Sequence, residues 1–165
     1  MIATALILEQ ARLEGIASSH YLALAYWAEL TGFPCMASWA RRRSLADREQ
    51  MKALLWYLTE FRGEEVTPPS LSVSSVVPES QVAALAAVVE MEVNQASQIQ
   101  SLAVQALGAG DLLFTSWLAS ALVCQVQTVA DLRGLLAQAE RSSGDAAAES
   151  MVDYLFDVYP ADPQA

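Results

Sequence analysis

The sequence predicts an all-α protein: a four-helix bundle with a long crossover between helices 2 and 3 and a short fifth helix. Three observations support this prediction. Four long segments consist mostly of good helix formers and are bounded by Gly, Pro or capping side chains. One connection is far longer than the others and is rich in Pro and Ser. The chain of 165 residues fits a single domain, residues 1–165, that can bury a core of its own.

The first two helices are separated by a clear stop signal. We expect the first helix from Ala3 to about Leu30, followed by the break Thr31-Gly32-Phe33-Pro34. The second helix is expected from Pro34 to Phe61, because Pro is favoured at a first helical position. Short connections of this kind join antiparallel neighbours.

The crossover is expected over Arg62–Val77. A connection of this length is unusual inside one domain unless the chain must travel the length of the bundle. It therefore indicates that the second and third helices are parallel, although its Val-rich part also has the composition of a short strand. The third helix is expected from Pro78 to about Leu107, before Gly108-Ala109-Gly110.

The last two helices follow in the same way. Asp111 is a good N-cap for the fourth helix, which is expected to reach about Arg141. A short helix is expected from about Asp145 to Tyr159, and Pro160 and Pro163 indicate a loose tail.

Charge and composition exclude some functions. The net charge is −10 and the isoelectric point is about 4.4, which argues against nucleic acid as a ligand because phosphate contacts need basic patches. Cys35 and Cys124 have no CxxC spacing, which indicates buried or idle thiols in a reducing compartment. We expect no secretion signal, because the first residues show no basic region followed by an apolar core. We therefore expect a cytoplasmic protein.

The high apolar content requires an explanation. Residues are 54% hydrophobic, and Leu112–Ala130 runs 19 residues without a charge, which is long enough to span a membrane. However, this segment contains several Thr, Ser and Gln residues, and it is flanked by Asp111 and Asp131 rather than by Lys or Arg. We favour a bundle helix that also faces a neighbouring subunit, and we expect no membrane partner.

The second helix carries the most informative pair of residues. Asp47 and Gln50 are three apart and project from one face. A carboxylate followed three residues later by His, pointing inward, is typical of di-iron bundles, and here Gln stands in the place of His. Glu14 and Glu92 lie near the middles of the first and third helices, so three carboxylates would meet at one depth as hard ligands for iron or manganese. The alternative is that Glu14 and Glu92 face solvent.

Other charged residues on these helices have simpler interpretations. We interpret the run Arg41-Arg42-Arg43 as a solvated or interface face. His20 is next to Tyr21 but points about a hundred degrees away around the helix, so we interpret it as a surface or interface histidine.

Several stretches in one register resemble the ferritin family, bacterial non-haem ferritins in particular. The resemblance covers nearly the whole chain and rests on joint spacing rather than on one strong motif. It is carried by Glu14 to Tyr21, Ala46 to Met51, Glu92 with Ile99, Trp117 to Gln125, and Met151 to Asp157.

The resemblance implies a hollow homo-oligomeric cage of 24 subunits that stores ferric mineral, with a ferroxidase centre in each bundle. Glu14, Asp47 and Gln50 would surround the first iron, and Glu92 and Gln125 the second. Tyr21 would stand beside the pair, either hydrogen-bonded to a ligand or acting as a catalytic electron donor. The alternative is a core tyrosine with a satisfied hydroxyl group.

The departures from the family pattern predict a weak centre. Gln50 removes the nitrogen ligand, and Asp47 reaches one methylene less far than the family's Glu. Arg48 stands where haem-binding members carry their axial Met, so no haem is expected. We therefore expect iron storage with a degenerate di-iron site and weak or lost ferroxidase activity. The alternatives are a non-enzymatic subunit with a role in assembly or co-assembly, and a di-metal carboxylate enzyme.

Overall fold

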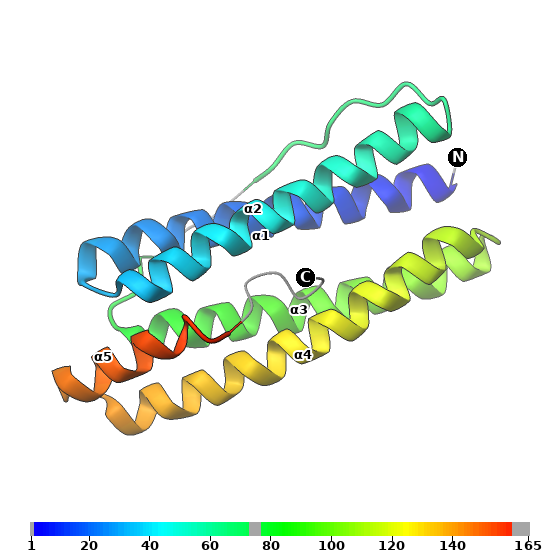
Figure 1. Ribbon diagram of the computed structural model, residues 1–165. Coiled ribbons are helices and arrows are strands. Elements are labelled where there is room, and N and C mark those ends of the chain that lie inside the picture. Colours follow the sequence, from blue (N-terminus) through cyan, green and yellow to red (C-terminus); the bar gives the residue numbers. More distant parts are fainter. Residues whose placement is uncertain (1, 73–76, 160–165) are drawn as a thin grey trace.

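The computed structural model describes residues 2–72 and 77–159, and all of its regular elements are helical (Figure 1). In chain order they are α1 (Ile2–Thr31), α2 (Pro34–Trp56), the π-helical turn η1 (Tyr57–Phe61), α3 (Gln81–Gly108), α4 (Leu112–Ser142) and α5 (Ala146–Leu155).

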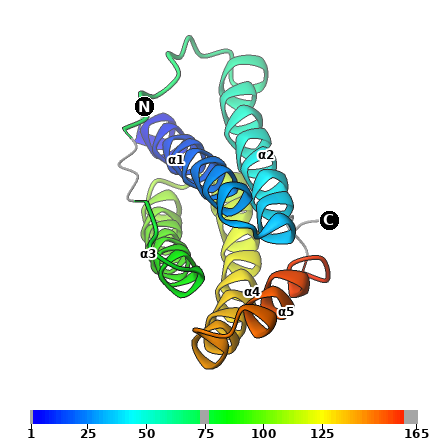
Figure 2. The same ribbon diagram turned by 90° about the vertical axis from the view of Figure 1, so that its left-hand side faces the viewer.

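The four long helices form two antiparallel pairs. Helix α1 packs along α2, and α3 packs along α4. Figure 1 shows that α2 and α3 run in the same direction, so the chain between them returns along the outside of the bundle. The end-on view shows the long helices around a common centre, with α5 at one end beside α4 (Figure 2). The predicted four-helix bundle with a long crossover and a short fifth helix is confirmed.

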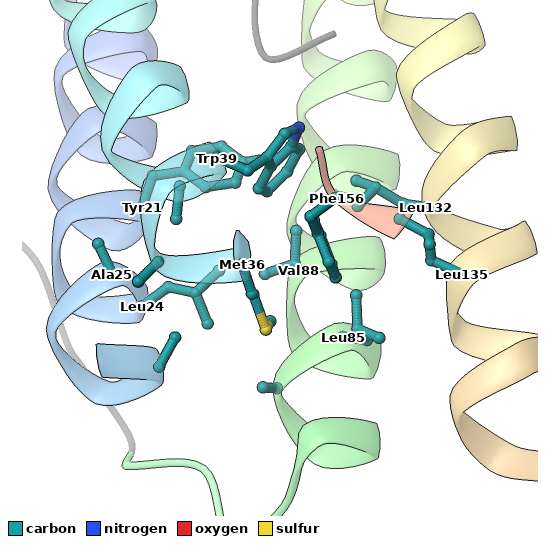
Figure 3. Packing of buried hydrophobic residues seen from close by; sticks show 14 of the residues in the cluster. Tyr21, Leu24, Ala25, Met36, Trp39, Leu85, Val88, Leu132, Leu135 and Phe156 are labelled. Atoms are coloured by element: carbon teal, nitrogen blue, oxygen red, sulfur yellow. The ribbon is translucent and has the colours of Figure 1, made fainter. Parts of the chain in front are cut away.

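Two hydrophobic clusters fill opposite ends of the bundle. One gathers the C-terminal half of α1, the start of α2, the start of α3, the end of α4, and α5. At its heart the Trp39 ring packs edge-on against Tyr21 and Phe156, with centroid distances of 5.4 and 5.2 Å (Figure 3). The second cluster takes the other half of each long helix. Its buried residues are Leu6, Ile7, Ala11, Leu13, Leu54, Leu58, Ile99, Leu102, Ala106, Phe114 and Leu118.

Helix α5 is held by a buried carboxylate. Asp153 accepts hydrogen bonds from the backbone N–H groups of Cys35 (3.1 Å) and Met36 (2.8 Å) in the first turn of α2. The N-cap residue of α2, Phe33, provides no side-chain cap of its own. Asp153 therefore supplies the missing acceptor and places negative charge at the positive end of the α2 dipole.

Two helix ends differ from the sequence prediction. Helix α3 begins at Gln81 rather than at Pro78, because the Ser80 side chain accepts a hydrogen bond from the N–H of Ala83. Helix α5 ends at Leu155, earlier than Tyr159. Much of the Val-rich part of the crossover, residues 73–76, and the predicted tail at Pro160 and Pro163 lie outside the described residues.

Gly15 lets the crossover approach the bundle closely. A Cβ atom at this position would lie 2.7 Å from Cδ2 of Leu71 and 2.8 Å from Sδ of Met51. Leu71 thus reaches from the crossover onto the backbone of α1, one residue beyond Glu14.

Helix α4 is long and apolar enough to cross a membrane by length and composition, as core helices of bundles also are. Here it packs against α3 and α5, and its buried residues include the polar Gln125 and Thr128.

Candidate metal centre

A layer of buried polar side chains lies between the two hydrophobic clusters. Along each long helix, these polar residues occupy the segment between the residues of one cluster and those of the other, except Gln10, which lies among the α1 residues of the second cluster. The layer therefore crosses the bundle at one depth, as the sequence predicts for its three carboxylates. Its members are Gln10, Glu14, Ser18, Arg43, Ser44, Asp47, Glu92, Gln95, Gln125 and Thr128.

Reciprocal hydrogen bonds join α1 to α2 in this layer. The Ser18 hydroxyl donates to the backbone carbonyl of Ser44 at 2.8 Å, and the Ser44 hydroxyl donates to the carbonyl of Ser18 at 2.7 Å. Small side chains at this crossing bring the two backbones close. The pair fixes the register between the helices that carry Glu14 and Asp47.

The guanidinium group of Arg43 is buried within this layer, beside two of its carboxylates. Only 5% of Arg43 is exposed. Its Nε lies 3.3 Å from Oδ1 of Asp47, one turn along α2, and its Nη2 lies 3.6 Å from Oε1 of Glu92 on α3. Its Cζ lies 5.7 Å from the centre of the Tyr21 ring. The interpretation of the whole arginine run as a solvated or interface face is wrong for Arg43, although Arg41 and Arg42 are exposed.

Glu92 is the most enclosed carboxylate and has several partners. It is fully buried; one of its oxygens accepts a hydrogen bond from the Tyr21 hydroxyl and the other from the Gln125 amide. The Gln125 amide also donates to the backbone carbonyl of Glu92 at 3.1 Å. Burial, followed by the nearby negative charge of Glu92, holds the pKa of Tyr21 well above its usual value. Tyr21 is therefore a neutral donor whose hydroxyl group is satisfied.

Glu14 faces the layer from α1. Its Oε1 accepts a hydrogen bond from the Gln10 amide at 2.7 Å. Burial is the main reason that the pKa of Glu14 is raised to about 7; the Gln10 hydrogen bond and the positive charge of Arg43 oppose this rise. Glu14 is therefore a carboxylate that changes its charge near neutral pH.

A small cavity remains on one side of Arg43. It has a volume of about 30 Å³, enough for a water molecule or a single ion, and it is bordered by Glu14, Asp47 and Gln50. Gln50 is half-buried at its edge. The other residues around the cavity are Arg43, Ala46, Ile99, Trp117, Ala121, Cys124 and Gln125.

The donor set does not fit a pair of metal ions. Among the described residues, no three His, Cys, Asp or Glu side chains converge as metal ligands. Glu92 already accepts hydrogen bonds on both oxygens, and the Arg43 cation lies between Glu92 and Asp47. Gln50 offers an amide where a nitrogen ligand is expected. A second divalent ion near Glu92 would meet a fixed positive charge.

The structure brings the predicted site residues into one region. Glu14, Asp47, Glu92, Gln125 and Tyr21 are buried in or next to the polar layer, and Gln50 lies at its rim. His20 is half-buried beside hollows between α1 and α3, outside the layer.

Sequence reasoning missed Arg43, although a signal was available. Met36, Ala40, Arg43 and Asp47 follow one another at spacings of three and four, so they share one face of α2. An inward Asp47 therefore requires an inward Arg43.

Comparison with known proteins decides the family. The family model for the ferritin-like domain matches residues 4–142. The chain belongs to the ferritin family. No curated protein matches this chain.

Solved structures agree with this assignment at the level of the fold. This ferritin superimposes on an open-pore ferritin from the hyperthermophilic archaeon Archaeoglobus fulgidus with a TM-score of 0.86 and 20% identity, over 96% of this chain and 97% of the other. A closed form of the A. fulgidus ferritin, engineered by mutagenesis, gives 0.85 and 21%, over 96% of each chain. A humanized archaeal ferritin gives 0.86 and 20%, over 96% and 95%.

Proposed function

We propose that this ferritin is an iron-storage subunit of a hollow cage whose bundle centre is a degenerate ferroxidase site. The proposal rests on the contrast between a complete ferritin architecture and an altered set of metal ligands. The ferritin architecture is present along the chain, including α5, but the five predicted metal ligands are three carboxylates and the amides of Gln50 and Gln125, with no imidazole nitrogen among them. The protein thus retains the form of an iron-storing subunit and has a poor donor set for rapid iron oxidation.

Exposed apolar side chains support assembly into a larger particle. Large apolar residues are exposed on every helix, and a soluble monomer rarely leaves this much apolar surface uncovered. The most exposed large apolar residues are Leu30, Val77, Phe61, Val123, Leu112, Val158, Val104, Trp56 and Met151. We propose that copies of the chain cover these residues in a homo-oligomeric cage of 24 subunits, the number that the family resemblance implies, and that the cage is cytoplasmic.

The centre itself favours a second candidate. Both carboxylate oxygens of Glu92 are occupied by internal donors, which suits a subunit that contributes shell and inner surface without oxidising iron itself. In this case an active ferritin subunit in the same cage supplies the ferroxidase step.

Two measurements test these functions. Size-exclusion chromatography with light scattering should give a particle of several hundred kilodaltons, because about two dozen chains of 17.8 kDa assemble. A monomer or dimer under all conditions contradicts the cage.

Aerobic addition of ferrous iron to the purified cage then tests storage and oxidation separately. We expect slow oxidation and an iron core that forms inside the particle. A rapid burst that consumes two irons per subunit contradicts the degenerate centre, and a cage that never retains iron favours the structural subunit.

A further inference from the structure

We propose that the Arg43 guanidinium is a built-in cation that takes the place of the second metal, so that the wild-type centre holds at most one divalent ion. The inference rests on the proposed degenerate ferroxidase centre and specifies its cause. It predicts that the position next to Glu92 becomes available to a second metal ion once the Arg43 cation is removed.

Arg43 lies where one cation can neutralise two carboxylates. Its guanidinium lies within 3.3 Å of Asp47 and 3.6 Å of Glu92, so one cation bridges carboxylates of two different helices. Two buried carboxylates facing each other without a cation would be strongly destabilising. Arg43 supplies the compensating charge that a metal would otherwise supply.

The surroundings of Arg43 keep it in place. The side chain is almost fully buried, and its flat guanidinium lies near the Tyr21 ring. Arginine remains charged in proteins, and its charge cannot be lost to make room for a metal ion. Displacing Arg43 would require moving it out through the packed layer.

The two halves of the centre therefore differ. The half next to Glu92 is filled by Arg43, the Tyr21 hydroxyl and the Gln125 amide. The half between Glu14, Asp47 and Gln50 retains the cavity of about 30 Å³. One small cation fits the open half, and a pair does not.

Removing Arg43 should open the second half. We choose Arg43→Met, which replaces the charged side chain by an apolar one of similar length and leaves Asp47 and Glu92 without their internal cation. The matched control is Arg42→Met, which makes the same charge change at an exposed neighbour. Arg43→Lys keeps the positive charge and should keep the second metal out.

The probe is Co²⁺, and its binding to the assembled, iron-free protein is measured by calorimetry. We expect Arg43→Met to bind about one more equivalent per subunit than wild type, at least about tenfold more tightly than wild type binds any second ion. Arg42→Met and Arg43→Lys should match wild type. The added equivalent should disappear in Arg43→Met/Glu92→Gln, which locates it.

Two results would overturn the inference. One is a wild-type protein that binds two Co²⁺ per subunit in the centre, a measurement that does not depend on the folding of any variant. The other is an Arg43→Met protein that binds Co²⁺ no better than Arg42→Met. Either result leaves cage assembly and iron storage standing, since those are tested by particle size and by core formation.

Discussion

The Nη2 atom of Arg43 lies 3.6 Å from Oε1 of Glu92, and both side chains are buried in the middle of the bundle. This contact joins α2 to α3, the two parallel helices on either side of the crossover. It lies between two hydrophobic clusters, where the dielectric is low and an uncompensated charge is costly. The stability of this ferritin should therefore depend on the charge balance of its polar layer.

Replacement of Arg43 by Met should destabilise the fold at neutral pH. Breaking a buried ion pair by removing one partner costs about 3–5 kcal/mol, because the remaining carboxylates stay buried. Thermal unfolding should show a large fall in the midpoint temperature, and added Co²⁺ should restore much of it by binding the folded state. Arg42→Met should unfold at nearly the wild-type temperature. Equal midpoints for the two variants would contradict the structural role of Arg43.

Glu14 should make stability depend on pH. Its pKa of about 7 in the folded state is above that of an exposed glutamate, so the unfolded chain releases this proton at lower pH than the folded chain does. The stability linked to the protonated form is therefore present below about pH 4.5 and is lost as pH rises toward 7. Above pH 7 the loss is complete and on the order of 3 kcal/mol.

The variant Glu14→Gln removes this dependence and can still accept the hydrogen bond from Gln10. Its midpoint temperature should equal that of wild type near pH 4.5 and exceed it increasingly up to pH 7. Glu90→Gln, at an exposed position on α3, should follow the wild-type curve. A pH-independent difference between Glu14→Gln and wild type would contradict the raised pKa of Glu14.

Asp153 should control the docking of α5. Asp153→Ala leaves the N–H groups of Cys35 and Met36 without their acceptor, at a cost of about 1–3 kcal/mol for the buried Met36 group and less for the partly buried Cys35 group. Asp153→Asn keeps one carbonyl oxygen but loses the charge at the helix end, so its stability should be intermediate. Hydrogen exchange at the two amides should accelerate in the same order. Unchanged exchange in Asp153→Ala would show that α5 does not cap α2 in solution.

Gly15 should be coupled to Leu71. Alanine has a higher helix propensity than glycine by about 1 kcal/mol, but its Cβ would overlap the Leu71 side chain. Gly15→Ala should therefore change the midpoint temperature little in the wild-type background and raise it in a Leu71→Ala background, where only the flexible Met51 side chain still has to move. A double-mutant cycle by thermal unfolding measures this coupling, and additive effects would mean that Leu71 does not rest on α1.

The fold was predictable because its signals are local. Helix formers, Gly and Pro breaks and the Asp111 and Asp145 caps define the helices, and the long crossover defines the parallel arrangement of α2 and α3. The start of α3 was misplaced because Pro78 is a weaker start signal than the Ser80 side-chain cap.

The centre was only partly predictable. The depth of its carboxylates in the bundle follows from their positions along the helices. The side chain that pairs with each carboxylate depends on how the helices pack, which the sequence of one helix does not specify. As part of a run of three arginines, Arg43 reads as belonging to a solvated or interface face, whereas helical spacing places it on the face of Asp47. The enclosure of Glu92 by Tyr21 and Gln125 joins three helices, and no pattern within one helix reports it.

The most direct test of the central claim is anomalous diffraction at the iron edge from wild-type crystals soaked in ferrous iron. We expect Arg43 to remain between Asp47 and Glu92, with at most one iron peak, in the cavity beside Glu14. Two iron peaks about 3.5–4 Å apart, with Glu92 bound to one and Arg43 displaced, would contradict it.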